Sequence, residues 1–252
     1  MGTRTAPKSI ADPKAVSGLK KPAPARGRAV SARKSVAAGD KTPRKSEREQ
    51  PYHHGDLHGA LLQAAKRVAE REGLNGLTLR AVAREAGVSH AAPAHHFGDI
   101  TGLLSELAAT GFQKFSAALG EAACHAGAGS EEGVAQAQAR ANAYVAFARE
   151  NPCMFQLMFR AERLDHNRPM LREASKVAFA KLAGIVSARR HEELQLDRLT
   201  LPQAADIARI WSLVHGFAML HLDGRLQHIL DASPGVTAEM LLAAMLSDST
   251  AK

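Results

Sequence analysis

The sequence has little cysteine, few aromatic residues and no long apolar run. Two of its 252 residues are cysteines, Cys124 and Cys153, and no Cys-x-x-Cys pair occurs, so neither a disulfide scaffold nor a cysteine-based zinc site is expected. No stretch approaches the ~18–20 apolar residues that span a bilayer, and the N-terminus lacks the apolar centre of a secretory signal. We therefore expect a cytoplasmic protein with no membrane partner.

Motifs of the common enzyme classes are also missing. The chain contains no Gly-x-Gly-x-x-Gly loop, no phosphate-binding Gly-Lys-Ser/Thr and no Gly-x-Ser-x-Gly elbow. Among its twelve histidines, His221 and His228 have the spacing of one helical face but lack further ligands at useful distances. We expect no enzymatic activity, no metal site and no cofactor.

Positive charge is concentrated in residues 1–50. This segment holds thirteen lysines and arginines against four acidic residues, a net +9, while the whole chain carries +8. It is rich in proline, alanine and serine and poor in large apolar residues, so it cannot bury enough surface to offset the entropy of ordering. The composition predicts a disordered basic tail. It is either a polybasic arm that attracts DNA phosphates or a weakly selected extension.

A helix-turn-helix pattern follows between residues 78 and 96. Thr78 can cap a helix whose apolar residues recur on one face, at Leu79, Val82, Ala83 and Ala86. Gly87 then ends this helix, because a residue without Cβ enters the left-handed conformation without strain. Ser89 is predicted to cap a second short helix over residues 90–96, slim enough for the major groove.

The segment before this motif predicts a third helix. Residues 56–72 place Leu57, Leu61, Ala64, Ala65 and Val68 on one face, and Gly73 closes the segment. Three helices of this size can share one small core, which a helix pair alone cannot build. We therefore predict a DNA-binding head over residues 51–98.

The rest of the chain, residues 99–252, also predicts helices only. Asp99 can cap a long helix of about 25 residues, and no strand-like alternation or internal repeat appears. Further helices are expected near residues 131–150, 153–159, 168–193, from Pro202 onward and 237–246. The fold class is all-α, with an N-terminal head and a C-terminal helical domain.

Two features of this second domain suggest function. Sulfur and aromatic groups gather in two segments and predict either plain core or the lining of a small-molecule pocket, with Phe155, Met158, Phe159, Trp211, His215 and Met219 as candidates. For His215, the alternatives are a ligand contact and a satisfied buried histidine. The last two long helices are apolar on more than one side, which predicts a central position or pairing with a second subunit as a homodimer.

The residues as a set resemble the TetR (tetracycline repressor) family of bacterial transcription regulators. The resemblance rests on these stretches: Tyr52-His53-His54-Gly55-Asp56-Leu57, Thr78 through Ser89, His95-His96-Phe97, and Trp211-Ser212-Leu213-Val214-His215-Gly216. The last stretch is similar to the Trp, His and Gly signature of one C-terminal subgroup. The resemblance covers about residues 51–250.

The resemblance implies a homodimer that represses transcription from a near-palindromic operator on double-stranded DNA. It also implies a C-terminal domain that dimerises and binds an effector, here an unidentified small apolar molecule. Carried over by position, Thr78 and Arg80 would approach phosphates. The groove or its walls would be faced by Ser89, His90, Ala91, Ala94, His95 and His96.

The head departs from the family pattern at three positions. Ala94 stands where an aromatic residue is usual, Ile100 stands where a lysine is usual, and Pro93 falls at the fourth helical position if Ser89 is the cap. Histidines are therefore the polar side chains left to contact base edges. The +9 tail is a candidate to replace the missing phosphate contacts. The alternative function is an architectural protein whose basic tail dominates weakly specific DNA binding.

Overall fold

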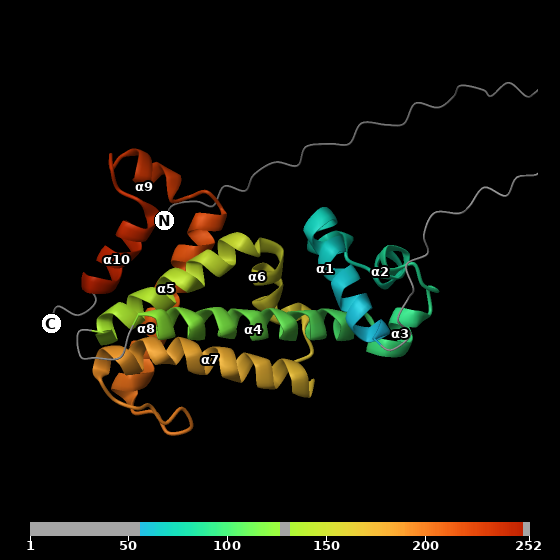
Figure 1. The fold of residues 1–252 in the computed structure, drawn as a ribbon, viewed down its shortest axis with the longest axis horizontal. Helices are drawn as coiled ribbons and strands as arrows, with labels where there is room; N and C mark the ends of the chain where they lie inside the picture. Colours follow the sequence, from blue (N-terminus) through green and yellow to red (C-terminus); the bar gives the residue numbers. More distant parts are fainter. Residues whose placement is uncertain (1–55, 127–131, 249–252) are drawn as a thin grey trace, which may run out of the picture. The chain divides into compact units, whose positions relative to one another are not determined.

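The computed structural model describes residues 56–126 and 132–248, and within these ranges every regular element is helical (Figure 1). The predicted all-α fold is confirmed. These residues all belong to one compact unit, Pro51–Lys252. The basic tail and residues 52–55 of the family motif lie outside the described residues.

Three helices form the N-terminal head: α1 (Leu57–Gly76), α2 (Leu79–Ala86) and α3 (Ala92–Phe97). The Thr78 hydroxyl accepts a hydrogen bond from the backbone N–H of Ala81 at 3.1 Å, and Gly87 adopts φ 68°, so the predicted start and end of α2 are confirmed. The predicted face of α1 is buried at Leu61, Ala64, Ala65 and Val68. A kink at Gly73, with φ 73°, carries α1 beyond its predicted end.

The start of α3 differs from the prediction. The helix begins two residues later than expected, with Ala91 as N-cap and no side-chain capping bond. The Ser89 side chain therefore does not cap it; instead, the Ser89 carbonyl accepts a hydrogen bond from the N–H of Ala92 at 3.1 Å. The later start places Pro93 in the first turn, where its missing N–H costs no helical hydrogen bond.

The C-terminal body consists of longer helices. Asp99 caps the first of them, as predicted, by accepting from the N–H of Gly102 at 2.8 Å. The body helices are α4 (Ile100–His125), α5 (Glu132–Glu150), α6 (Pro152–Met158), α7 (Pro169–Arg190), α8 (Leu201–Leu222), α9 (Gln227–Asp231) and α10 (Ala238–Asp248). The sequence did not predict the short α9 or the 3-10 turn η1 (Ala161–Arg163), because single turns carry no periodic pattern.

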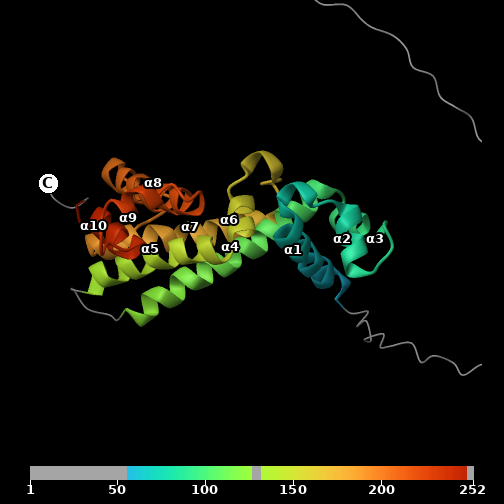
Figure 2. The ribbon, with the colours of Figure 1, turned by 90° about the horizontal axis from the view of Figure 1, so that it is seen from above.

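Helix α4 is the central element of the body. It packs against α5, α6 and α7, and its first turns also contact α1 and α3, so head and body share one continuous hydrophobic core (Figure 1). Figure 2 shows α8 lying over α5 and α7 on the side away from α4. Among the described residues, no helix is long and apolar enough to span a membrane.

Candidate nucleic-acid interface and ligand cavity

The outer surface of the head carries all eight residues predicted to face DNA. Two lie at the start of α2, and six lie in the turn and on α3. All eight are exposed: Thr78, Arg80, Ser89, His90, Ala91, Ala94, His95 and His96. The helix-turn-helix therefore presents these side chains to solvent and buries Pro93 and Phe97 on its opposite side.

Positive charge on this surface comes from α2. Arg80 and Arg84 are exposed and one turn apart, and no ion pair joins either of them to another residue that the structure describes. Arg67 and Arg71 on α1, by contrast, bind Glu85 at 2.7 and 2.9 Å, and these hydrogen bonds lower the pKa of Glu85. The sequence reasoning missed Arg84, although its spacing of four residues from Arg80 marks the same helical face.

Helix α3 offers histidines instead of arginine or lysine. His95 and His96 are exposed in its last turn, and the His96 ring lies 5.9 Å from that of His58 on α1. Imidazole nitrogens can donate to or accept from base edges. The surface of α3 therefore has hydrogen-bonding groups without fixed positive charge.

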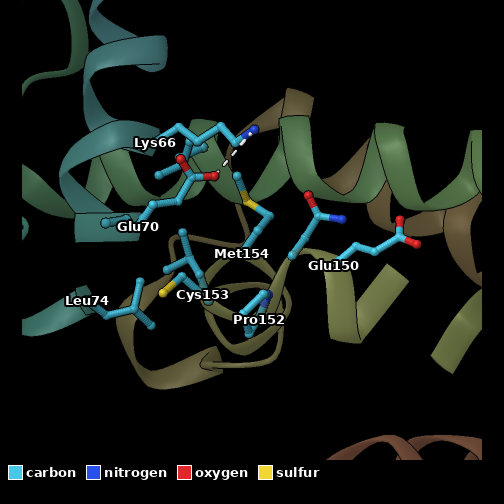
Figure 3. Close-up of a pocket in the computed structure, with 11 residues that line it drawn as sticks. Lys66, Glu70, Leu74, Glu150, Pro152, Cys153 and Met154 are labelled. Atoms are coloured by element: carbon cyan, nitrogen blue, oxygen red, sulfur yellow. Dashed lines mark ion pairs between the residues drawn. The ribbon is translucent and has the colours of Figure 1, made fainter. Parts of the chain in front are cut away.

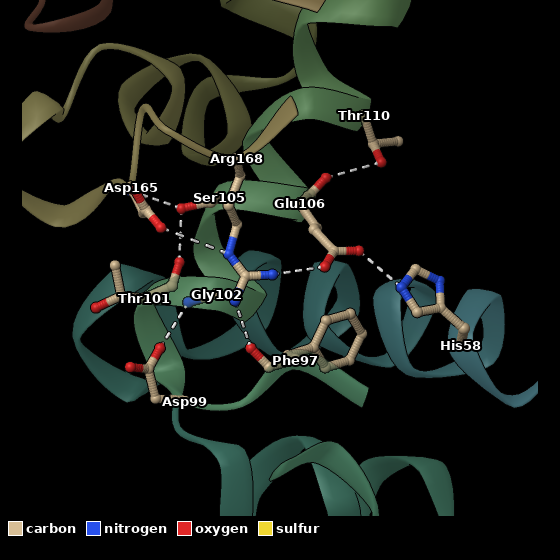
Figure 4. A network of polar contacts seen from close by, with 10 residues as sticks. All are labelled: His58, Phe97, Asp99, Thr101, Gly102, Ser105, Glu106, Thr110, Asp165 and Arg168. Carbon is tan, nitrogen blue, oxygen red and sulfur yellow. Dashed lines mark hydrogen bonds and ion pairs between the residues drawn. The ribbon is translucent and has the colours of Figure 1, made fainter. Parts of the chain in front are cut away.

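A polar network joins the inner side of the head to the body (Figure 4). Glu106 of α4 is buried, and its carboxylate accepts from His58 Nε2 at 2.7 Å and from Arg168 Nη1 at 2.9 Å. Arg168, the N-cap residue of α7, also donates from Nη2 to the carbonyl oxygen of Phe97 at 2.7 Å. The buried carboxylate is thus paired with cationic or hydrogen-bonding groups on two other elements, as burial of a charge requires.

Gly102 makes room for this arrangement. A Cβ at this position would lie 2.0 Å from the Phe97 carbonyl oxygen and 2.3 Å from Arg168 Nη2. Beside it, Ser105 accepts a hydrogen bond from the N–H of Asp165 at 2.8 Å and donates to the Thr101 carbonyl (Figure 4). The segment that precedes α7 is therefore held to the first turns of α4.

The body carries an apolar cavity of about 240 Å³ that is partly open to solvent. Three of the six predicted pocket residues, Met158, Phe159 and Trp211, line it. The remaining lining residues come from α4, α5, η1, α7 and the segment between the last two: Phe112, Phe115, Tyr144, Ala161, His166, Ser175, Ala178, Phe179 and Leu182. The sequence did not predict these nine residues, because they are dispersed over three α-helices, the turn η1 and a loop.

The other three predicted pocket residues do not line this cavity. Phe155 is fully buried and packs against Phe159 and Tyr144, and Met219 packs against the core from a half-buried position. His215 accepts a hydrogen bond at Nδ1 from the Tyr144 hydroxyl at 2.9 Å. Burial lowers the pKa of His215 and raises that of Tyr144. The imidazole is therefore neutral, and the Tyr144 hydroxyl keeps the proton that it donates in the hydrogen bond.

A second cavity of about 300 Å³ lies between the head and the body. Lys66 and Glu70 of α1 form an ion pair at 3.4 Å on one wall, and Pro152, Cys153 and Met154 form the opposite wall (Figure 3). Cys153 is half-buried, whereas Cys124 is exposed on α4. In the part of the chain that the structure describes, no three histidine, cysteine or acidic side chains are grouped as a metal site would require.

Comparison with known families gives two matches that together span most of the described chain. Residues 61–107 match the family described as "Bacterial regulatory proteins, tetR family", and residues 137–245 match "Tetracyclin repressor-like, C-terminal domain". No curated protein matches the sequence.

Solved structures agree with this fold. A protein of unknown function from Rhodococcus sp. RHA1 is 33% identical, with a TM-score of 0.63 over 79% of this chain and 96% of its own. A protein described as regulatory, SCO4313, is 20% identical, with a TM-score of 0.57 over 77% of this chain and 95% of its own. One described as a TetR family transcription regulator, from Shewanella sp. PV-4, is 18% identical, with a TM-score of 0.53 over 76% of this chain and 96% of its own.

Proposed function

The chain belongs to the TetR family of bacterial transcription regulators, and on that premise we propose that it is a ligand-responsive repressor that binds a near-palindromic operator as a homodimer. Family membership makes it a DNA-binding regulator with a ligand-binding domain. The proposal of a ligand-responsive repressor rests on one observation: an exposed helix-turn-helix surface and an apolar cavity lie in the same compact unit.

The surface of the head supports binding in the major groove. Arg80 and Arg84 are available for phosphates, which position a protein on the duplex without reading its sequence. His90, His95 and His96 are available for base edges, which carry the sequence information. The proposal therefore assigns phosphate contacts to α2 and base reading to the α3 region.

The cavity supports an effector that is small and apolar. Its lining is mostly aromatic and aliphatic, and the few lining residues that carry a polar group are Tyr144, His166, Ser175 and Trp211. Its volume of about 240 Å³ lies below the ~300–1,000 Å³ that is usual for drug-sized ligands. A compact molecule with one or two hydrogen-bonding groups would fit this space.

Exposed apolar residues on α8 and α10 support the homodimer. Leu220 and Met240 are 43% and 55% exposed, and a Cβ added at Gly216 would meet nothing within 4 Å. Together with the small residues Ala208 and Ser212, this part of α8 offers a surface on which another helix can pack closely. Native mass spectrometry should give twice the chain mass of 26.8 kDa, and Leu220→Glu with Met240→Glu should reduce it to one chain.

DNA binding tests the function directly. We expect the protein, acting in the bacterial cytoplasm where its operator lies, to prefer the promoter DNA beside its own gene over random DNA by ~10³ or more in a competition gel shift. A ratio near one would favour the alternative, an architectural protein dominated by its thirteen-cation tail. Deleting residues 1–50 separates the two functions, because only the architectural protein loses nearly all of its DNA affinity.

The effector is tested by native mass spectrometry of the protein purified from its host. A retained small apolar molecule that is displaced by Ala178→Phe, a substitution in the cavity wall, would support the ligand-responsive part of the proposal. The proposal would be contradicted if protein from cells grown under many conditions never retained a molecule in the cavity and bound DNA equally well in every preparation.

A further inference from the structure

We propose that Arg168 couples the occupancy of the body cavity to the position of the recognition helix α3. This inference rests on the proposed function, because it assumes that the cavity holds a ligand and that α3 reads DNA. Arg168 is a positioning residue in this scheme, since it touches neither the cavity nor the outer surface of α3.

The first observation is the contact between Arg168 and the end of α3. The guanidinium donates at 2.7 Å to the carbonyl oxygen of Phe97, which is the last residue of α3. Its other arm binds Glu106 at 2.9 Å, and the same carboxylate binds His58 on α1 at 2.7 Å. A planar guanidinium can hold both partners in one fixed geometry (Figure 4). Displacement of Arg168 would therefore release the end of α3 and leave Glu106 with His58 of α1 as its remaining partner.

The second observation is the short path from Arg168 to the cavity. His166, two residues before Arg168, lines the cavity, and so does Ala161 of η1. On the other side, Ser175 and Ala178 of α7 line the cavity. Ser175 is seven residues from Arg168, about 10 Å along a helix. Arg168 therefore lies between two cavity-lining segments of the same chain.

The third observation is that the link is tightly packed on its inner face, where Leu171, Ala174 and Ala178 of α7 are buried, while Pro169 and Met170 face solvent. Pro169 fixes the backbone after Arg168, Leu171 is fully buried, and Gly102 leaves no space for even one additional carbon beside the guanidinium. A close-packed interior transmits displacement better than a loose one. A shift of α7 away from a ligand would thus move Arg168 relative to Phe97, and would not be absorbed between them.

The test fills the cavity by substitution, because the natural effector is unidentified. Ala178→Phe serves as the cavity occupant, and Lys176→Phe, which adds the same ring at an exposed position of α7, is the matched control. Affinity for DNA selected from a random pool by the wild-type protein is measured for wild type, Arg168→Gln and Arg168→Lys, each with and without Ala178→Phe. Lys176→Phe is measured in the wild-type and Arg168→Gln backgrounds. Ser175→Phe is a second occupant should Ala178→Phe not fold.

We expect Ala178→Phe to weaken binding by at least about tenfold when Arg168 is present and far less when it is Gln. Lys176→Phe should have no effect in either background. Arg168→Lys should also lose the coupling. A lysine keeps a positive charge beside Glu106, but it has no second nitrogen to bind the Phe97 carbonyl at the same time. Equal effects of the occupant in all three backgrounds would overturn the inference, as would a lysine variant that behaves like wild type.

A second readout follows the helix itself. In wild-type protein, the cavity occupant should increase amide hydrogen exchange at Gly98, whose N–H donates to the Ala94 carbonyl at the end of α3. Unchanged exchange at Gly98 would overturn the inference. Failure of the proposed function is distinguishable, because the wild-type protein would then select no DNA sequence at all.

Discussion

The outer and inner sides of the head hold their polar side chains in different ways. On the outer side, Arg80 and Arg84 are exposed and form no ion pair with another residue that the structure describes. On the inner side, Glu106 is buried and bound by both Arg168 and His58. These two outer arginines are therefore available to a partner, whereas the inner carboxylate is already engaged.

This difference predicts which property each substitution changes. An exposed side chain without partners contributes little to stability, and its loss affects what the protein binds. A buried, charge-assisted contact contributes to stability, and its loss also displaces the elements it joins. Matched substitutions on the two sides should therefore give different results, and equal responses would show that the two sides do not differ in this way.

The largest effect is expected at Gly102. Gly102→Ala should reduce the free energy of unfolding by about 3 kcal/mol, because its Cβ would displace both Arg168 and the Phe97 carbonyl. Gly120→Ala is the control on the same helix, where Lys181 at 3.7 Å is the nearest contact. It should stabilise by about 0.5–1 kcal/mol. Urea unfolding measures both values, and a neutral Gly102→Ala would contradict the close packing of the junction.

Glu106 gives the next largest effect. Glu106→Gln should cost about 2 kcal/mol in urea unfolding, because it replaces two charge-assisted hydrogen bonds at a buried site. Glu85→Gln is the matched outer substitution and also loses two arginine contacts. Because those contacts are solvent-exposed, it should change stability by less than about 0.5 kcal/mol. Equal losses at the two positions would remove the distinction between the two sides.

Arg84 tests the outer side. Arg84→Ala should weaken operator binding by about tenfold and reduce the dependence of log affinity on log salt by about one. Its unfolding free energy should stay unchanged. Arg67→Ala, which removes a cation already bound to Glu85, should affect DNA binding less. Fluorescence anisotropy at several salt concentrations gives both numbers. A salt dependence that is the same in Arg84→Ala as in wild type would exclude a phosphate contact.

The smallest effect is expected from His215. Burial lowers the pKa of this imidazole in the folded state, so the unfolded chain takes up the proton first as pH falls. Its stabilising contribution is complete above the ordinary histidine pKa of about 6.5 and is lost as pH falls through the lower folded value. Wild-type protein should therefore lose more stability than His215→Gln between pH 7 and pH 5, as measured by thermal unfolding. Equal losses of thermal stability in the two proteins between pH 7 and pH 5 would contradict the lowered pKa of His215.

Local chemistry made much of the head predictable. The cap at Thr78, the turn at Gly87 and the cap at Asp99 each depend on residues within four positions, and all three were found from the sequence. The predicted first residue of α3 was wrong, because the pattern around Ser89 is compatible with a helix that begins at residue 90 or at Ala92. The sequence cannot choose between them without the packing of Pro93.

The junction and the cavity were not predictable in the same way. Glu106 and Arg168 are separated by 62 residues, and Tyr144 and His215 by 71 residues. Only one signal was available: Glu106 interrupts the apolar stretch around Leu104 and Leu107, so it falls on a buried face. A buried carboxylate needs a partner, but nothing in the sequence identifies which arginine provides it.

A hydroxyl-radical footprint on selected DNA measures directly whether paired recognition helices read a specific sequence. We predict two protected half-sites related by two-fold symmetry, with centres ~10 base pairs or a multiple apart, and loss of both when His95 and His96 are replaced by alanine. Continuous protection that is independent of sequence and unchanged by those replacements would contradict it.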